Sequence, residues 1–109
     1  MKYITKDSGQ RKDYKSGFRR DLNVGKPRYD LIPHELLTRL AELYARGAEK
    51  YGDSNWTLAD KNSHEEVNRF KESGYRHFIQ WFRGDIDEDH LSAVVFNLFA
   101  HEWITKYKK

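Results

Sequence analysis

Residues 84–104 read GDIDEDHLSAVVFNLFAHEWI, and they combine the most apolar helical pattern of the chain with its densest group of acidic side chains. Apolar residues cover most of a helical circumference here, namely Leu91, Val94, Val95, Leu98 and Trp103. Such a distribution is typical of a helix that neighbouring helices enclose, rather than of one that lies on a surface. The stretch therefore predicts an all-α fold organised around this last helix, which we expect to continue to about Tyr107.

Polar residues interrupt this apolar pattern on one stripe. Asn97 and His101 lie seven and eleven residues after His90. Steps of these lengths return to nearly the same helical angle, so the three residues share one stripe with Val94. The sequence therefore predicts a polar seam that faces the interior. A cluster of carboxylates is expected at the mouth of the seam, formed by Asp85, Asp87, Glu88 and Asp89. The helix dipole alone also favours an acidic first turn, so a purely structural origin of the cluster stays open.

A first helix is expected from about Pro33, which suits a first-turn position, to about Tyr51, where Gly52 can end it. Its glutamates and arginines recur at steps of three and four residues with alternating sign, which is typical of a self-pairing surface ladder. Alternatively, Glu42 and Glu49 are metal ligands, if this face meets another acidic element. The ladder is the simpler interpretation because each acid has a basic neighbour within reach.

A second helix is expected to begin with a capping box from Ser63 to Glu66 and to run to Arg83, before Gly84. Gly74 lies in its middle, where glycine costs about 1 kcal/mol relative to alanine, so we expect a close contact with another helix there. The inward face is expected to carry Phe70, Gly74, His77, Phe78 and Trp81.

Residues 1–24 have no sustained hydrophobic period and carry many basic side chains. We expect an extended basic N-terminal arm with little structure of its own, followed by a single all-α domain over residues 25–109. No strand is expected, because no hairpin dipeptide lies between alternating runs. About three main helices make a small bundle. The last helix is apolar on most sides, and two neighbouring helices cannot bury all of that surface. The sequence therefore predicts a homo-oligomer, either a dimer or larger.

The composition narrows the range of functions. With 38% apolar and 34% charged residues, burial is limited and much of the core must be aromatic. The absence of cysteine excludes disulfides and thiolate metal sites and is consistent with the cytoplasm. No apolar run approaches the ~20 residues that span a bilayer, so no membrane partner is expected. The net charge of +3 comes with basic ends but without a recognition-helix signature, so nucleic acid is not an expected partner.

Two loops carry side chains suited to phosphates and planar rings. In residues 25–33, GKPRYDLIP, Lys26 and Arg28 flank a rigid proline next to Tyr29, which suits a clamp for a phosphate and a base. The same segment is alternatively an ordinary surface loop whose apolar residues pack on the core. Residues 50–56, KYGDSNW, place a cation, an amide and a large ring in one turn, as at the lip of a pocket.

Four segments resemble one known family, and they are GKPRYDLIP at 25–33, RGAEKYGDSNW at 46–56, Arg76-His77, and RGDIDEDHL at 83–91. In this order they are similar to the phage family of dATP/dGTP diphosphohydrolase N-terminal domains, from about Ser16 to the last helix. That family is similar to the all-α nucleotide pyrophosphohydrolases of the MazG type. The resemblance implies a purine-nucleotide-binding domain over residues 25–109, acting in the cytoplasm of an infected host cell. It also implies cleavage of dATP or dGTP, with Mg²⁺ or Mn²⁺, to the monophosphate and pyrophosphate.

The resemblance assigns roles to individual residues. The catalytic group would be Asp87, Glu88 and His90. The metal ligands would be Asp85, Asp87 and Asp89, since hard cations prefer oxygen. The phosphates would be bound by Lys26, Arg28, Lys50 and Arg76. The base would be contacted by Tyr29, Tyr51, Asn55 and Trp56, while His77 and Asn97 would complete the nucleotide site through interior hydrogen bonds.

One departure from the MazG-type pattern leaves a second hypothesis open. Those enzymes carry an acidic pair on each of two neighbouring helices, whereas no Glu-x-x-Glu occurs in the first helix here. A chain with rings and cations but an incomplete metal site would bind nucleotides without cutting them. The alternative function is therefore an anti-defence sponge without a cofactor. It would sequester nucleotide immune signals such as cyclic dinucleotides or cyclic ADP-ribose derivatives.

Overall fold

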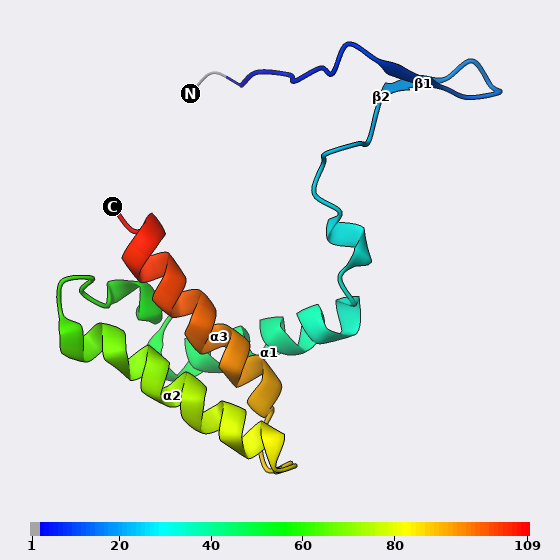
Figure 1. The fold of residues 1–109 in the computed structure, drawn as a ribbon. Coiled ribbons are helices and arrows are strands. Elements are labelled where there is room, and N and C mark those ends of the chain that lie inside the picture. The colour runs from blue at the N-terminus through cyan, green and yellow to red at the C-terminus, as the bar shows by residue number, and fades with distance from the viewer. Residues whose placement is uncertain (1–2) are drawn as a thin grey trace. The chain divides into compact units, whose positions relative to one another are not determined.

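The computed structural model describes residues 3–109, which divide into two compact units between Leu31 and Ile32. The N-terminal unit, which ends at Leu31, holds a β-hairpin. The helical unit, Ile32–Lys109, holds the three α-helices (Figure 1). The candidate site lies within the helical unit.

A short antiparallel hairpin forms the N-terminal unit, with β1 at Arg11–Asp13 and β2 at Arg19–Asp21. The prediction of an arm without strands is therefore wrong. The strand residues are all charged and mostly exposed, so the alternation of apolar and polar residues that identifies a strand is missing. Oppositely charged side chains face each other across the two strands instead. The Arg19 guanidinium donates to the Asp13 carboxylate opposite it, with 2.7 Å between Nε and Oδ1.

The turn between the two strands is closed by its own backbone. Tyr14 N donates to Phe18 O and Gly17 N donates to Tyr14 O, both at 2.9 Å. The Tyr14 and Phe18 rings lie 5.3 Å apart. Gly17 has a φ of +90°, a conformation that glycine adopts without steric cost. Gly17 thus allows the chain to reverse direction between the two strands.

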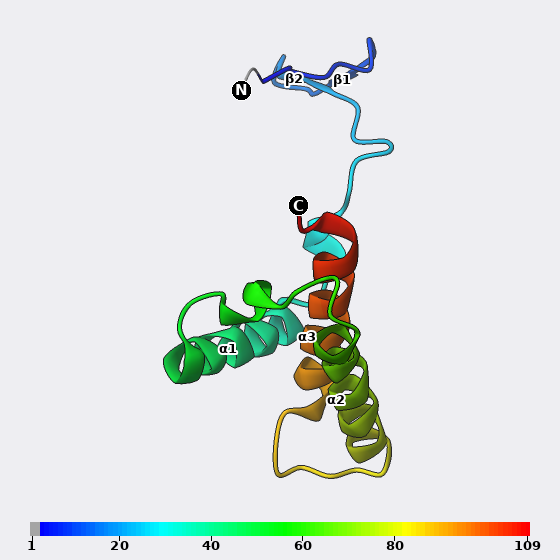
Figure 2. The same cartoon turned by 90° about the vertical axis from the view of Figure 1, so that its left-hand side faces the viewer.

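The helical unit consists of α1 (His34–Tyr51), α2 (His64–Phe82) and α3 (His90–Glu102). A turn of π-helix, Trp103–Tyr107, continues α3, and a 3₁₀ turn, Asn55–Leu58, lies between α1 and α2. α2 and α3 lie antiparallel and side by side, and α1 crosses α3 at a steep angle (Figure 1, Figure 2). The prediction of a mostly helical fold with three main helices is confirmed. Among residues 3–109, no helix has both the length and the apolar character that crossing a bilayer requires.

The ends of the helices follow their local sequence signals. Ser63 Oγ accepts a hydrogen bond from Glu66 N at 3.2 Å, so the predicted cap of α2 is confirmed. The Glu66 side chain does not complete the box but accepts from Asp60 N at 3.3 Å. Gly52 and Gly84 follow α1 and α2 with φ angles of +93° and +89°, in the region that favours glycine at a helix end.

Gly74 marks a close contact between α2 and α3. It is buried, and a Cβ at its position would lie 3.3 Å from the Cβ of Asn97. The predicted helix–helix contact at this glycine is therefore confirmed. A larger side chain has no room there unless the helices move apart.

We expect Gly74→Leu to lower the free energy of unfolding by about 1–3 kcal/mol, because an over-packed side chain pushes α3 away from α2. Gly74→Ala should be close to neutral, since a gain in helix propensity of about 1 kcal/mol offsets the tight contact with Asn97. Urea unfolding followed by circular dichroism measures both variants. A leucine variant as stable as the parent protein would show that the two helices do not pack at this position.

The buried face of α3 differs from the predicted one. Apart from Ser92, the buried positions of α3 and of the π-helical turn after it follow a seven-residue repeat of mostly small or polar side chains, namely His90, Ala93, Asn97, Ala100 and Ile104. The interior polar seam is thus confirmed for His90 and Asn97. The predicted enclosure of the large apolar residues is wrong for a single chain, because Leu98 is 53% exposed and Trp103 is 37% exposed. Small side chains let α3 approach α2 closely and leave the larger ones at the flanks.

A cluster of aromatic rings connects α1, the 3₁₀ turn, α3 and the π-helical turn that continues α3. The Trp56 ring lies 6.3 Å from Tyr44, 6.2 Å from Phe96 and 5.3 Å from Trp103, each in edge-to-face geometry. Such pairs contribute about 0.5–1.5 kcal/mol each beyond the burial of their surface. Few apolar side chains of residues 3–109 are fully buried, so this half-covered cluster is an important part of the core.

Candidate functional site

An open cavity of about 860 Å³ lies between α1, α2 and the start of α3. Most of the predicted site residues of the helical unit line it, and they are Lys50, Tyr51, Arg76, His77, Asp87, Glu88, Asp89 and Asn97. They come from three helices and from the loop before α3. The fold therefore brings together side chains that are far apart in the sequence.

Three cations of the cavity wall are available to bind a ligand. Arg46, Lys50 and Arg76 form no ion pair with any residue that the structure describes. Their donor groups therefore have no carboxylate to leave when an anion arrives. Unpaired cations gathered around an open cavity attract a polyanion such as a string of phosphates.

His90 is buried at the start of α3 and is held through both ring nitrogens. Its Nε2 lies 2.7 Å from Asp87 Oδ1, and its Nδ1 lies 2.9 Å from Nδ1 of His77 on α2. The hydrogen bond to His90 is the main cause that lowers the pKa of Asp87, so this carboxylate is ionised at neutral pH. An ionised carboxylate only accepts hydrogen bonds. Nε2 of His90 therefore carries the proton of this hydrogen bond, which leaves Nδ1 of the same ring facing His77.

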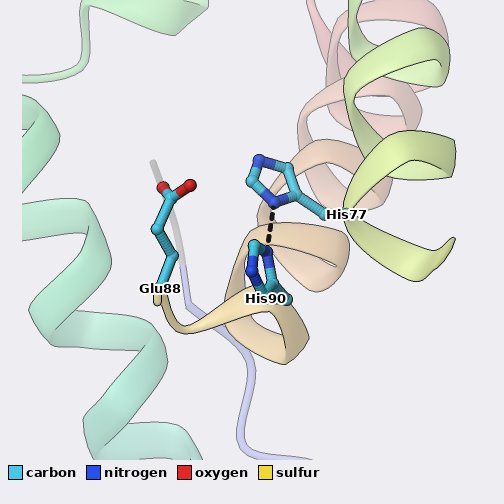
Figure 3. A group of neighbouring side chains, drawn as sticks. All are labelled: His77, Glu88 and His90. Atoms are coloured by element: carbon cyan, nitrogen blue, oxygen red, sulfur yellow. Dashed lines mark hydrogen bonds between the residues drawn. The ribbon is translucent and has the colours of Figure 1, made fainter. Parts of the chain in front are cut away.

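Two groups of possible metal ligands share His90. One ligand atom from each of His77, Glu88 and His90 lies within 4.8 Å of the other two. Asp85, Asp87 and His90 form a second group by the same distance. Figure 3 shows the ring of His77, on α2, hydrogen-bonded to the ring of His90, with the Glu88 side chain beside them on the loop before α3.

His77 and Glu88 are the reactive side chains that face the cavity at this end. Burial is the main cause that lowers the pKa of His77, and the neighbouring Arg76 guanidinium lowers it further. His77 is therefore uncharged at neutral pH and has a lone pair to offer. Glu88 is exposed and, within residues 3–109, has no ion-pair partner. A neutral imidazole and a free carboxylate thus lie in one cavity with three cations.

Asp89 has a structural role at the start of α3. It accepts a hydrogen bond from Ser92 N at 3.2 Å, which caps the helix. Arg39 of α1 donates to both of its oxygens, at 2.6 Å from Nη2 and 3.0 Å from Nε, and this pair holds the pKa of Asp89 far below its usual range. The ladder interpretation of α1 is therefore wrong for Arg39, which pairs with a different helix.

The aspartates predicted to bind a metal fit a magnesium ion poorly. Each already has a partner at 2.6–2.7 Å, which is Arg39 for Asp89, Arg83 for Asp85 and His90 for Asp87. Mg²⁺ binds through oxygens that are free to coordinate it and keeps several waters. A magnesium ion at the three aspartates would therefore have to break existing pairs.

We expect Asp89→Ala to lower the free energy of unfolding by about 1–2 kcal/mol, because α3 loses its cap and Arg39 loses its partner. About half of the Arg39 side chain is exposed, so screening keeps the ion-pair share below about 1 kcal/mol. Asp89→Asn should lose less, since an amide oxygen still caps the helix. Urea unfolding of the three proteins measures the differences.

The pH dependence of stability gives this prediction a second check. Because the folded protein lowers the pKa of Asp89, the ionised carboxylate stabilises the fold above its unfolded-state pKa of about 3.9. That contribution is lost as the pH falls toward the lower folded value. The gap in stability between the parent and Asp89→Asn should therefore stay nearly constant down to about pH 5 and shrink as the pH falls below that value. A gap that stays constant below that value too would contradict the role of the charge.

A second open cavity of about 800 Å³ adjoins the first and has a largely apolar wall. Tyr51 lines both cavities and is 69% exposed, and Asn55 lines the second. Trp56 also lines the second cavity, but its ring packs against the aromatic cluster of the core. The predicted base-contacting residues of this unit therefore differ in their availability to a ligand.

Three predicted site residues, Lys26, Arg28 and Tyr29, belong to the N-terminal unit. Within that unit the Arg28 guanidinium donates to both oxygens of Asp30, at 2.7 and 2.9 Å, and Lys26 Nζ lies 3.8 Å from Asp21. Tyr29 begins a 3₁₀ turn and is 77% exposed. A phosphate would have to compete with these carboxylates, and the part of the three residues in nucleotide binding stays a prediction.

Sequence reasoning missed two cations of the cavity wall, Arg39 and Arg46. They precede Lys50 by eleven and four residues, spacings that keep all three on one face of α1. The alternating charges of α1 indicate a surface ladder, and that interpretation hides the shared face. The position of Arg46 at the head of the segment RGAEKYGDSNW was the available signal.

A family model described as dATP/dGTP diphosphohydrolase, N-terminal, matches residues 16–109. The match covers all four segments that carry the resemblance and every residue that lines the two cavities. The suspected family is therefore confirmed. No curated protein and no solved structure shows a significant match to the chain.

Proposed function

The chain belongs to the dATP/dGTP diphosphohydrolase N-terminal domain family, and from that premise we propose that it binds dATP or dGTP and hydrolyses it to the monophosphate and pyrophosphate. One observation carries the proposal. Three cations that lack a carboxylate partner among residues 3–109 share a cavity with the imidazole of His77 and the carboxylate of Glu88. Cations to hold phosphates and groups to handle a proton are the two requirements of such a hydrolase.

The cations would bind the triphosphate. Arg46 and Lys50 lie one turn apart on α1, and Arg76 lines the same cavity from α2. An arginine guanidinium binds phosphate oxygens in pairs, while lysine contributes a compact positive charge. Because the cavity is open to solvent, affinity for the triphosphate should fall as the ionic strength rises.

The second cavity would hold the purine base. Four residues line both cavities, so one ligand can extend from the cation-lined wall to the apolar one, and they are Leu43, Gly47, Tyr51 and Phe96. Tyr51 offers an exposed ring at this boundary, which suits stacking on a base. The Asn55 amide both donates and accepts hydrogen bonds, as the polar edge of a purine requires.

Hydrolysis would proceed by attack of water on the α-phosphorus. The bond from this phosphorus to the oxygen that bridges to the β-phosphate breaks, and pyrophosphate leaves. The attacking water loses one proton, which the free Glu88 carboxylate accepts, while Asp87 and His90 hold the His77 ring in place beside it. A bound divalent cation would offset the negative charge of the phosphates.

Incubation followed by heat release of the ligand tests the proposal. The protein is mixed with dATP, dGTP or a panel of cyclic dinucleotides, each with Mg²⁺, Mn²⁺ or Zn²⁺, and anion-exchange chromatography identifies what is released. We expect dAMP or dGMP with pyrophosphate, and unchanged cyclic dinucleotides. Recovery of intact dATP and dGTP from a protein that binds them would overturn hydrolysis in favour of sequestration. The double variant Lys50→Ala, Arg76→Ala shows whether any activity comes from the cavity.

We also propose that the protein is a homo-oligomer. Phe78, Trp81 and Phe82 form an aromatic cluster on α2, with ring centroids 6.0 and 6.1 Å apart, and they are 42%, 48% and 74% exposed. The prediction that Phe78 and Trp81 face the interior is thus wrong for a single chain. Since the helical unit buries few apolar side chains completely, a second copy over this cluster would extend a core that is otherwise thin.

Light scattering on the eluate of a sizing column tests the oligomer. We expect the parent protein to elute as a dimer or larger, and Phe82→Glu, which buries a charge in the proposed interface, to elute as a monomer. Leu37→Glu places the same charge at an exposed position of α1 and serves as the control. A monomeric parent protein, or loss of the oligomer in both variants, would contradict an interface at the α2 cluster.

A further inference from the structure

We infer that His77, Glu88 and His90 bind a divalent transition-metal ion of the Zn²⁺ class in preference to Mg²⁺. Two imidazole nitrogens and one carboxylate oxygen, within 4.8 Å of one another, make up this group. Imidazole suits zinc and similar ions, whereas Mg²⁺ favours carboxylates and water. A pair of histidines with one glutamate is also a donor set that leaves a fourth position of a zinc ion open to water or substrate.

Asp87 is the second observation that points to a metal. A histidine that binds a metal almost always donates its other ring N–H to a carboxylate or carbonyl, which fixes the tautomer and the ring orientation. His90 has that arrangement, because its Nε2 lies 2.7 Å from Asp87 Oδ1 and its side chain is only 1% exposed. The atom left for an ion is Nδ1, and this nitrogen is the one that faces His77.

The spacing of the two imidazoles suits a shared ion. Nδ1 of His77 and Nδ1 of His90 lie 2.9 Å apart. Two nitrogens bound to one tetrahedral zinc at about 2.0–2.1 Å lie about 3.3–3.4 Å apart. If the distance between the two nitrogens increases by about half an ångström, an ion can replace the proton that they share. That proton then moves from Nδ1 to Nε2 of His77. Glu88 lies on a loop and is exposed, so one of its carboxylate oxygens can turn inward to complete the site. Its second oxygen then remains to accept the proton of the proposed hydrolysis.

The neighbouring group of Asp85, Asp87 and His90 is a weaker candidate. An ion there would have to displace the Arg83 guanidinium from Asp85 and the His90 ring from Asp87. At His77, Glu88 and His90 only one hydrogen bond has to open. Any role of the ion in hydrolysis rests on the proposed function, but the binding of the ion does not.

Metal titration without nucleotide tests the inference. The full chain without an affinity tag is stripped with a chelator, then titrated with ZnCl₂ or MgCl₂ in a calorimeter and with CoCl₂ in a spectrophotometer. We expect saturation at a single Zn²⁺ per chain, visible Co²⁺ absorption that Zn²⁺ abolishes, and no comparable binding of Mg²⁺. Since the assay contains no nucleotide, failure of metal binding and failure of hydrolysis are observed separately.

Matched variants locate the ion. His77→Gln, on a partly exposed ring, should abolish the Co²⁺ absorption, and Asp87→Asn should weaken Zn²⁺ binding about 10- to 100-fold. His64→Gln changes an exposed histidine at the first residue of α2 and should leave binding unchanged. Circular dichroism of each variant shows that the fold is intact. The inference is overturned if no Zn²⁺ binds, if His77→Gln binds as the parent does, or if Asp85→Asn rather than Glu88→Gln removes binding.

Discussion

Glu88→Gln is expected to lower kcat for the hydrolysis of dATP or dGTP by about 100- to 1000-fold while leaving the fold intact. The amide has the size of the carboxylate but cannot accept a proton from the attacking water. Glu88 is exposed and precedes the cap of α3, so the free energy of unfolding should change by less than about 0.5 kcal/mol. Steady-state release of pyrophosphate measures kcat, and urea unfolding measures stability.

Glu65→Gln is the matched control for this prediction. It makes the same chemical change in the first turn of α2, at a residue that lines neither cavity. Its kcat should equal that of the parent protein. If Glu88→Gln keeps the parent activity while His77→Gln loses it, the reaction depends on the imidazole, as proton acceptor or as metal ligand, and not on the carboxylate. If both variants keep full activity, the reaction does not take place at this end of the cavity.

The ends of the helices could be predicted because their signals are local. A cap such as Ser63 and a stop such as Gly52 or Gly84 act within one turn of the chain. Gly74 could be predicted for a similar reason, since a glycine inside a helix is costly unless another helix approaches closely. One sequence contains these short-range signals in full.

The buried face of α3 could not be predicted because the helix is apolar on nearly every side. A hydrophobic pattern selects a face only where one side is polar, and here it offers several. The packing is decided instead by small residues, with Gly74 of α2 opposite Asn97 of α3. The hairpin was missed for a related reason, since its strands are joined by charges such as Arg19 and Asp13 and carry no apolar face.

The candidate site could be predicted as a set of residues but not as a set of contacts. The cations, histidines and carboxylates stand in recognisable segments of the sequence. Their partners do not, because Arg39 reaches Asp89 across fifty residues and His77 meets His90 from another helix. Periodicity orders residues around one helix and says nothing about which faces of two helices meet. The metal assignment depends on such pairings, which is why the family resemblance implies three aspartates whereas we infer a mixed group.

Trp56→Ala is expected to lower the free energy of unfolding by about 2–4 kcal/mol. The indole lies edge-to-face against Tyr44, Phe96 and Trp103, so its removal leaves a space between α1 and the C-terminal helix. The value falls below the largest aromatic-to-alanine losses because the ring is not completely buried. Urea unfolding followed by circular dichroism measures the loss.

Tyr51→Ala distinguishes a ring that contacts the base from a ring that packs in the core, such as Trp56. Tyr51 is largely exposed and lines both cavities, so its removal should change stability little and weaken nucleotide binding by about 1–3 kcal/mol, the range for a ring stacked on a base. Calorimetry with dATP, under conditions in which both proteins are folded, measures that loss. If Trp56→Ala instead unfolds like the parent protein but no longer binds dATP, then Trp56 is the base contact and the aromatic cluster is not part of the core. If Tyr51→Ala binds dATP as the parent does, the base does not stack on Tyr51.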